Sequence, residues 1–177
     1  GYVGFCLTVD SAYYGRRERD KAKAFSPVQR SHVSGVNYQA ALNWGVVERL
    51  RQKTKLPLIL KGIATAEDAK IAVEHGVDVI YISNHGGRQL DHGRGSIEVL
   101  PEVVDAVGGQ ARVVVDGGFY HGADILKAIA LGADAVGLGR LYGFGLAAFG
   151  QAGVVRVLEI LEEEMTSAMA LLGITDL

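Results

Sequence analysis

The stretch Ile80-Tyr81-Ile82-Ser83-Asn84-His85-Gly86-Gly87-Arg88-Gln89-Leu90-Asp91 decides the fold, because an apolar run stops abruptly there and a polar, glycine-rich run follows. Such a change is typical of a buried strand that ends in a loop whose backbone approaches another group closely. His85 is a residue type that changes charge near neutral pH, and Arg88 offers a planar fork for a carboxylate or phosphate. The stretch therefore predicts a catalytic arrangement at the end of a strand.

Outward from this stretch, apolar runs alternate with segments of helical periodicity. The apolar runs predict strands over residues 3–9, 56–60, 78–82, 112–115 and 135–138. Helical spacing predicts helices over residues 39–54, 65–75, 96–107, 123–131 and 153–172, the last of which is a long closing helix. The highly charged residues 15–23 are expected to form a solvated loop, and residues 25–38 a long irregular connection.

Polar, charged or glycine residues follow every predicted strand, at Asp10, Lys61, 83–88, 116–118 and 139–140. Alternating strands and helices indicate an α/β fold with a parallel sheet, so these clusters fall at the carboxyl ends of the strands. In a (β/α)8 TIM barrel these ends form the face that carries the active site, and the last two strands often bind phosphate. A complete barrel needs about 250 residues. The chain is therefore predicted to hold the C-terminal five βα units of eight, with a five-stranded doubly wound sheet as the alternative.

The composition limits the class of protein. The 177 residues are 49% hydrophobic and carry a net charge of −2, which gives no sign of a nucleic-acid or membrane surface. No apolar stretch reaches the length of a membrane span and no signal peptide is visible, so a cytoplasmic location is expected. The chain lacks a starting methionine and opens almost directly into a strand. Residues 1–177 are therefore interpreted as one part of a longer barrel domain.

Several short motifs in a fixed order carry a resemblance to a known family. Residues 83–91 resemble the signature of the FMN-dependent α-hydroxy-acid oxidases and dehydrogenases, which include glycolate oxidase, lactate oxidase and mandelate dehydrogenase. Further motifs match in the same order, at residues 7–10, 16–18, 56–62, 116–118 and 139–140. The resemblance covers essentially the whole chain, and it begins at what looks like the family's fourth barrel strand.

The resemblance implies FMN as the cofactor and a small L-2-hydroxy acid as the substrate, which is oxidised to the 2-keto acid. His85 would be the base that takes a proton from the substrate, and Asp10 would orient its imidazole. Arg88 and Arg17 would bind the substrate carboxylate. Lys61 would lie by the flavin N1–C2=O edge, where negative charge accumulates on reduction.

The same resemblance implies the remaining cofactor contacts. Thr8 and Ser83 would hydrogen-bond the flavin ring, and Asp116 would lie near the ribityl chain. The phosphate would be held by the Arg140 guanidinium and by backbone groups around Gly117, Gly118, Phe119 and Gly139. No residue is assigned to a metal.

Residues 119–122, Phe-Tyr-His-Gly, depart from the family pattern. Relatives carry arginines soon after Asp-Gly-Gly, and one of them reaches toward the FMN phosphate. Tyr120 can donate only one neutral hydrogen bond, so the contact with the phosphate is an open question. The family's first three strands, which carry part of the flavin contacts, have no counterpart in the chain.

Two other functions stay open at this point. Another phosphate-binding TIM-barrel flavoenzyme would share the last two glycine turns, and an inactive truncated half-barrel would at most bind a partner. The sequence does not choose among oxygen, a quinone and a cytochrome as the electron acceptor. The resemblance implies a homotetramer for the complete protein, and no nucleic-acid partner is expected.

Overall fold

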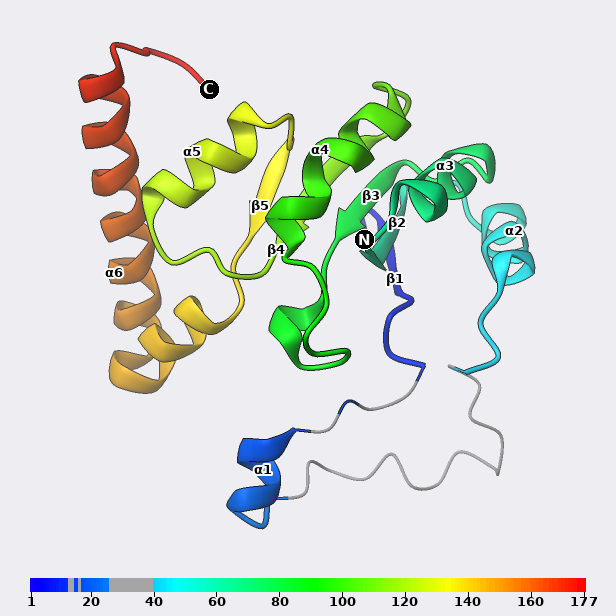
Figure 1. Cartoon of the computed structure of the whole chain (residues 1–177), viewed down its shortest axis with the longest axis horizontal. Helices are drawn as coiled ribbons and strands as arrows, with labels where there is room; N and C mark the ends of the chain where they lie inside the picture. The colour runs from blue at the N-terminus through cyan, green and yellow to red at the C-terminus, as the bar shows by residue number, and fades with distance from the viewer. Residues whose placement is uncertain (13–14, 16, 26–39) are drawn as a thin grey trace.

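The computed structural model describes residues 1–12, 15, 17–25 and 40–177, and strands alternate with helices along them (Figure 1). The strands are β1 (Phe5–Thr8), β2 (Leu58–Ile63), β3 (Val79–Ile82), β4 (Arg112–Asp116) and β5 (Ala135–Gly137). The helices are α1 (Glu18–Ala22), α2 (Trp44–Lys53), α3 (Ala66–Glu74), α4 (Ser96–Val107), α5 (Gly122–Ala130) and α6 (Arg140–Leu172). A short 3-10 turn, η1 (His85–Gly87), follows β3. The predicted alternation is confirmed.

The five strands form one parallel sheet in the order β1-β2-β3-β4-β5. Each strand pairs with the next one along the chain, as Thr8 does with Lys61 and Asp116 with Gly137. A doubly wound sheet reverses its strand order at a switch point, and no reversal occurs here. The chain therefore forms five consecutive βα units of a (β/α)8 barrel followed by a closing helix, and the doubly wound alternative is wrong.

The hydrophobic core lies on one face of this sheet. Alternate strand residues are almost fully buried, namely Leu58, Leu60, Ile80, Ile82, Val113 and Val115. They form a single cluster with buried side chains of α3 and α4. Because side chains alternate along a strand, the intervening residues, such as Lys61 and Asp116, point to the opposite face. Helices α3 and α4 thus cover the apolar face of the sheet, and the polar strand residues lie on the opposite, inner face.

Two aspartates tie neighbouring strands together near their amino ends. Asp78, before β3, accepts a hydrogen bond from the Leu58 N–H at 2.8 Å and pairs with an arginine of α2. Asp134, before β5, accepts one from the Val113 N–H at 2.7 Å and pairs at 2.5 Å with the arginine that begins β4. Burial alone would raise the pKa of each carboxyl, but these hydrogen bonds and arginines outweigh it and lower the pKa. Both carboxylates are therefore bound most tightly in their charged form.

Three boundaries near the amino end differ from those expected from sequence. Residues 18–22 form helix α1 where the charge run predicts a loop, and acidic residues in the first turn with basic ones in the last favour that helix. Helix α2 begins at Trp44, after an Asn43 in extended conformation, rather than at residue 39. Strand β2 runs on to Ile63, and its register with β3 shifts between Lys61 and Ile63. Most of the irregular connection expected over 25–38 lies outside the described residues.

Helix α6 begins at Arg140, well before the helix expected over 153–172. Its backbone leaves helical geometry at Phe149 and Gly150, so it consists of two helical parts. Gly145 and Gly153, on either side of this break, contact each other through their backbones. A Cβ on Gly145 would lie only 2.6 Å from the Gly153 carbonyl oxygen. The glycines that permit this contact also hide the first part of the helix from sequence periodicity.

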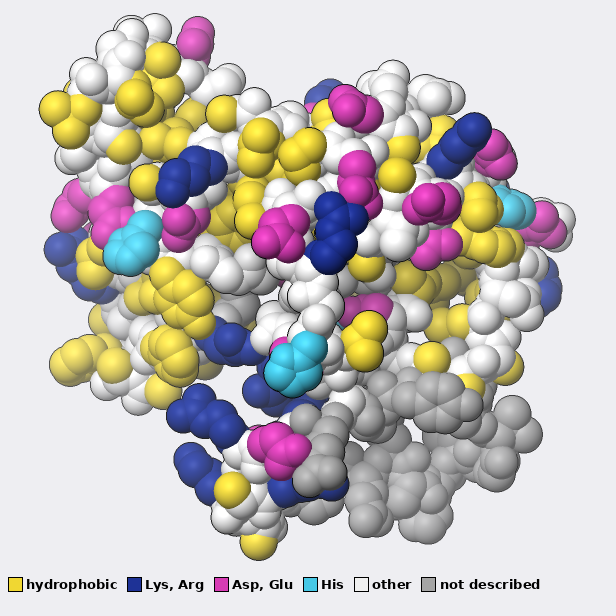
Figure 2. Space-filling model, viewed as in Figure 1, with side chains coloured by type: hydrophobic (Ala, Val, Ile, Leu, Met, Phe, Trp, Pro, Cys, Tyr) yellow, Lys and Arg dark blue, Asp and Glu magenta, His cyan; other side chains and the backbone are white. Residues whose placement is uncertain are grey.

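Helix α6 is strongly apolar and largely exposed. In the part of the chain that the structure describes, it is the one helix long and apolar enough to cross a membrane by length and composition, and 17% of its most apolar window is buried. The sequence expectation of no such stretch is therefore wrong. Figure 2 shows apolar side chains on the α6 side of the molecule, and the exposed ones include Phe144, Leu146, Phe149, Leu158 and Leu172. The break at Phe149 and Gly150 means that α6 is not one continuous rod.

Candidate active site

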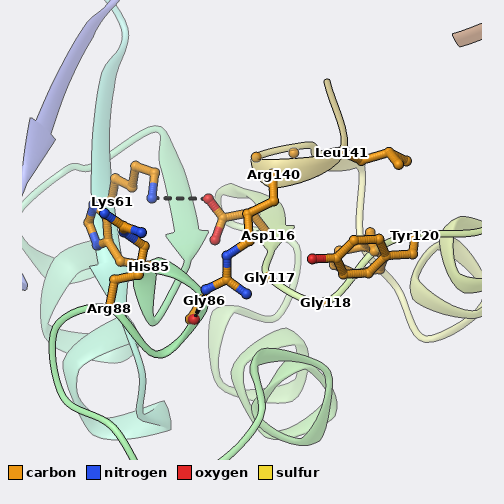
Figure 3. Close-up of a pocket in the computed structure, with 13 residues that line it drawn as sticks. Lys61, His85, Gly86, Arg88, Asp116, Gly117, Gly118, Tyr120, Arg140 and Leu141 are labelled. Atoms are coloured by element: carbon orange, nitrogen blue, oxygen red, sulfur yellow. Dashed lines mark hydrogen bonds and ion pairs between the residues drawn. The ribbon is translucent and has the colours of Figure 1, made fainter. Parts of the chain in front are cut away.

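A cavity of about 330 Å³ opens at the carboxyl ends of the strands. It is lined by Lys61, His85, Gly86, Arg88, Asp116, Gly117, Gly118, Phe119, Tyr120, Gly137, Gly139, Arg140 and Leu141. The lining residues come from β2, β4 and β5, from the turns after β3, β4 and β5, and from the start of α6, as Figure 3 shows for the labelled residues. Most of the clusters that sequence reasoning placed at strand ends therefore meet in one place.

His85 and Asp10 form a short hydrogen-bonded pair beside this cavity. His85 Nδ1 lies 2.5 Å from Asp10 Oδ2, and the two side chains are 32% and 17% exposed. Because the Asp10 carboxylate accepts a hydrogen bond from Nδ1–H, it favours the tautomer in which Nε2 has a free lone pair. Asp10 Oδ1 is buried with no hydrogen-bond partner among the described residues. This arrangement can accept a proton at Nε2 and stabilise the resulting imidazolium.

Lys61 lies in a polar cluster on the inner face of the sheet. Its Nζ donates a hydrogen bond to Ser83 Oγ at 2.7 Å. The same Nζ lies 3.0 Å from Asp116 Oδ2, as Figure 3 shows. The same ammonium lies 4.9 Å from the ring centre of Tyr81. Burial, followed by the charge of Asp116 and a hydrogen bond to it, raises the pKa of Tyr81. The Tyr81 hydroxyl therefore stays protonated. The Lys61 ammonium, held by Ser83 and Asp116, places a positive charge at the cavity wall.

Of the two arginines expected at the substrate carboxylate, the structure places Arg88 in the cavity lining. Arg88 lines the cavity with its side chain 48% exposed, and its guanidinium lies 3.9 Å from Asp20 of α1. Arg17 is the residue that precedes α1, and it is not among the cavity-lining residues of the described part. Figure 1 shows α1 apart from the sheet, and Arg88 approaches this helix through Asp20. The joint role of Arg17 and Arg88 stays a prediction.

The far end of the cavity suits an anionic group. Gly117 and Gly118 have φ of +97° and +84°, and Gly118 and Gly139 have open space where a side chain would stand. Arg140 lines this end and also donates a hydrogen bond to the Gly86 carbonyl. Figure 2 shows several Lys and Arg side chains gathered beside a hollow in the lower half of the view. Backbone left bare by glycines, with a guanidinium beside it, is a common form of phosphate site.

The residues present fit FMN by their donor set. The glycine turns and Arg140 match its phosphate, and the Lys61 ammonium matches a ring that gains negative charge. Asp116 Oδ1 is buried with no hydrogen-bond partner in the described part of the chain, which matches a hydroxyl-bearing ribityl chain. Phe119 is 7% exposed and lines the same space. Their individual cofactor contacts stay predictions.

The departure at residues 119–122 has a structural counterpart. Tyr120 lines the cavity and is 39% exposed, so it can contact a ligand there. His121 instead turns to α6, where its Nδ1 lies 3.2 Å from Glu164 Oε1. Glu164 also accepts the Gly122 N–H at 2.6 Å, and this bond, with His121, lowers the pKa of Glu164. Of these two side chains, Tyr120 faces the cavity and His121 anchors helix α6.

Two expected flavin-ring contacts lie close to the cavity without lining it. Thr8 is the last residue of β1 and pairs with Lys61 in the sheet. Ser83 is 1% exposed, and its Oγ accepts hydrogen bonds from both Lys61 Nζ and the His85 N–H, the latter at 3.1 Å. Ser83 therefore connects the ammonium to the histidine turn.

Sequence reasoning overlooked Tyr81 and Asn84. Tyr81 looks like an ordinary strand residue in the sequence. It pairs with Lys61 in the sheet, however, so strand alternation puts its side chain on the same inner face as Lys61. Asn84 accepts the Gly86 N–H at 2.9 Å through its side chain. An asparagine two residues before a glycine is a signal for such a turn.

Comparison with known proteins agrees with this site. The family model described as FMN-dependent dehydrogenase matches residues 1–177. An L-lactate oxidase from Nostoc sp. is 44% identical over 100% of the chain and 55% of that protein, and a peroxisomal (S)-2-hydroxyacid oxidase from Arabidopsis thaliana is 46% identical over 98% and 53%. The chain thus spans about half the length of the curated relatives it matches.

Solved structures give the same result. A mandelate oxidase variant with (S)-mandelic acid superposes with a TM-score of 0.88 at 46% identity, over 98% of the chain and 52% of that protein. A related mandelate oxidase structure contains a C4a-OH-FMN adduct, with a TM-score of 0.87. Since the family model covers every residue and the cavity carries the matching donor set, the chain belongs to the FMN-dependent dehydrogenase family.

Proposed function

We propose that the chain forms the carboxyl-terminal part of an FMN-dependent enzyme that oxidises a small L-2-hydroxy acid to the 2-keto acid. The observation that carries this proposal is the His85–Asp10 pair, at 2.5 Å, on the rim of a cavity that also holds Lys61 and Arg88. Relatives named lactate oxidase, 2-hydroxyacid oxidase and mandelate oxidase support the substrate class.

Oxidation of a 2-hydroxy acid removes two electrons and two protons from its H–C–O–H unit and forms a C=O bond. When bound, FMN would supply the acceptor for the two electrons and one of the two protons. His85 takes the other proton at Nε2, and Asp10 stabilises the imidazolium through Nδ1. The geometry is compatible with a proton taken from oxygen or from carbon, so the order of the two transfers stays open.

Charged groups around His85 orient the reactants. Arg88 is the cavity arginine available for the substrate carboxylate, which would have to compete with Asp20 for it. Lys61, held by Ser83 and Asp116, places a fixed positive charge where negative charge develops. Arg140 and the glycine turns hold the phosphate end. These assignments place His85, Arg88 and Lys61 at one end of the cavity and the glycine turns with Arg140 at the other.

The direct test is the visible spectrum of the chain mixed with FMN, before and after anaerobic L-lactate, glycolate or (S)-mandelate. We expect a bound flavin band that bleaches with at least one substrate. His85→Ala should keep the bound band and bleach roughly 10²- to 10⁴-fold more slowly, because a positioned base contributes that much. His92→Asn is the matched control, since His92 is an exposed histidine outside the cavity lining.

The outcomes separate the alternatives. Equal bleaching in the wild type and His85→Ala would contradict the role of His85 and favour a different flavoenzyme. A chain that binds no FMN would contradict the cofactor assignment and favour the inactive half-barrel. The electron acceptor, the homotetramer, the cytoplasmic location and the assignment of residues 1–177 to a single domain stay predictions.

A further inference from the structure

The turn that carries His85 has a backbone that a histidine rarely adopts. His85, Gly86 and Gly87 have φ of +52°, +63° and +74°, so three consecutive residues lie in the left-handed region. The two glycines adopt this conformation without steric cost, whereas in His85 it brings the Cβ close to the backbone and is unfavourable. Such a conformation persists only where the surroundings enforce it.

Asn84 enforces it from inside the turn. Its side-chain carbonyl accepts the Gly86 N–H at 2.9 Å, which closes a small ring around His85. Its backbone carbonyl also accepts the Gly87 N–H at 3.1 Å. Both bonds span His85, so the φ of His85 is set between two acceptors of the preceding residue.

Asn84 is in turn fixed by groups outside the turn. Its side-chain amide donates a hydrogen bond to the Arg94 carbonyl at 3.3 Å, in the loop before α4. On the other side, a Cβ on Gly117 would lie 3.2 Å from Asn84 Oδ1, so the turn after β4 packs closely against the amide. Rotation of the Asn84 amide would therefore either break its hydrogen bond to the Arg94 carbonyl or bring it into collision with the turn at Gly117.

We propose that Asn84 is a positioning residue that holds His85 in the left-handed conformation in which its Nδ1 meets Asp10. The consequence for catalysis rests on the function proposed above. Ser83 and Arg140 also bind the turn, through the His85 N–H and the Gly86 carbonyl. Each of them also serves elsewhere, however: Ser83 binds Lys61 and Arg140 lines the cavity. Asn84 contacts the turn and the two neighbouring loops that brace it.

The test uses the ¹⁵N-labelled chain without cofactor and reads the proton on His85 Nδ1 by NMR. A proton in a bond as short as 2.5 Å to a carboxylate gives a resonance far downfield, identified by its loss in His85→Gln. Asn84→Ala should lose or shift this resonance while the amide spectrum shows a folded chain. Asn43→Ala should leave it unchanged, because within the described residues the Asn43 side chain donates locally, to the Ala41 carbonyl before α2.

A conservative variant keeps the proposal falsifiable if Asn84→Ala does not fold. Asn84→Asp retains the acceptor for the Gly86 N–H but cannot donate to the Arg94 carbonyl, so the downfield resonance should be weakened less than in Asn84→Ala. An equal loss in the two folded variants, or retention of the resonance in a folded Asn84→Ala, would overturn the positioning role.

A second measurement distinguishes this inference from the proposed function. With FMN bound, Asn84→Ala should slow flavin reduction by substrate by about 10²-fold with little change in the substrate concentration at half-maximal rate, because His85 is misplaced and not removed. If Asn84→Ala lost the resonance but kept the wild-type rate, the positioning role of Asn84 would be supported and the role of His85 as base would be contradicted. A slower rate with an unchanged resonance would overturn the positioning.

Discussion

At the scale of single residues, Gly137 shows how closely the cavity wall is fitted. A Cβ on Gly137 would overlap the Tyr81 hydroxyl and lie 3.1 Å from Asp116 Cβ. Asp116 in turn lies 3.0 Å from Lys61. The absence of a side chain on Gly137 of β5 therefore leaves room for Tyr81 of β3. Tyr81 in turn lies beside Asp116, the ion-pair partner of Lys61.

Gly137→Ala should displace Tyr81 and disturb the pair of Lys61 and Asp116. We expect the free energy of unfolding to fall by about 1–3 kcal/mol, the usual cost of overpacking, and FMN binding to weaken. Urea unfolding and FMN fluorescence titration measure the two effects. Gly143→Ala is the control, because open space surrounds its Cβ and α6 continues through it. Unchanged stability and FMN affinity in Gly137→Ala would show that the wall adapts freely.

The individual site residues could be read from sequence to different extents. His85, Lys61, Asp116 and Arg140 could be located because glycines and charges interrupt apolar runs at strand ends. The partner of His85, Asp10, lies 75 positions away in the sequence, and only the family resemblance suggested it. Arg17 was expected beside Arg88, but a run of charged residues does not show that Arg17 directly precedes a helix and is absent from the cavity lining of the described part. Tyr81 was missed because its hydroxyl lies next to residues of other strands, Asp116 of β4 and Gly137 of β5, which the local sequence does not reveal.

At the scale of elements, the two aspartates before β3 and β5 act as braces between strands. The pKa of Asp78 and of Asp134 is lowered in the folded chain, so each carboxyl binds protons less readily there than in the unfolded chain. Their contribution to stability is therefore complete above the unfolded pKa near 4. It is lost as the pH falls through the lower, folded value.

Asp78→Asn and Asp134→Asn should each flatten the loss of stability between about pH 5 and pH 2. At pH 7 each should cost roughly 0.5–1 kcal/mol, because the pairs are partly exposed and the amide oxygen can still accept the strand N–H. Chemical unfolding at a series of pH values measures both effects. Asp105→Asn, an exposed aspartate of α4, is the control. A profile in the two variants that matches the wild type would exclude a bracing role.

Element boundaries followed from sequence where a local signal was strong. Helix α4 spans 96–107 as predicted, and Gly108 ends it with a φ of +55°. Thr65 caps α3 by accepting the Asp68 N–H at 3.2 Å. The first part of α6 was missed because its glycines serve a contact with a later turn of the same helix. Such a contact has no local signature, so tertiary packing overrides the helical pattern there.

At the scale of the whole molecule, cofactor binding should stabilise the fold, because the cavity joins four successive βα units. Saturation with FMN at 100 times its Kd should add about 2.7 kcal/mol to the free energy of unfolding, or roughly 5–10 °C in Tm for a chain of this length. Riboflavin, which lacks the phosphate, should raise Tm less. Arg140→Met should narrow the difference between the two ligands. Equal shifts with FMN and riboflavin in the wild type would argue against a phosphate site at Arg140.

The overall architecture was the most predictable level. Alternating strands and helices with a sequential parallel order require only that each apolar run find its neighbour, which local connections of this length enforce. The cavity follows, since parallel strands bring their carboxyl ends together. Helix α1 and the fold-back of α6 depend on contacts outside this repeat, so the repeat could not predict them.

The sequential sheet has a practical consequence for handling the protein. Within the described residues, β1 and β5 each pair on one side only. An unpaired strand edge is a template for another chain, and β1 is the longer of the two, with Phe5 and Cys6 exposed along it. Self-association of the purified chain should therefore start at β1 and rise with concentration, so dilute samples with a reducing agent suit every solution experiment described above.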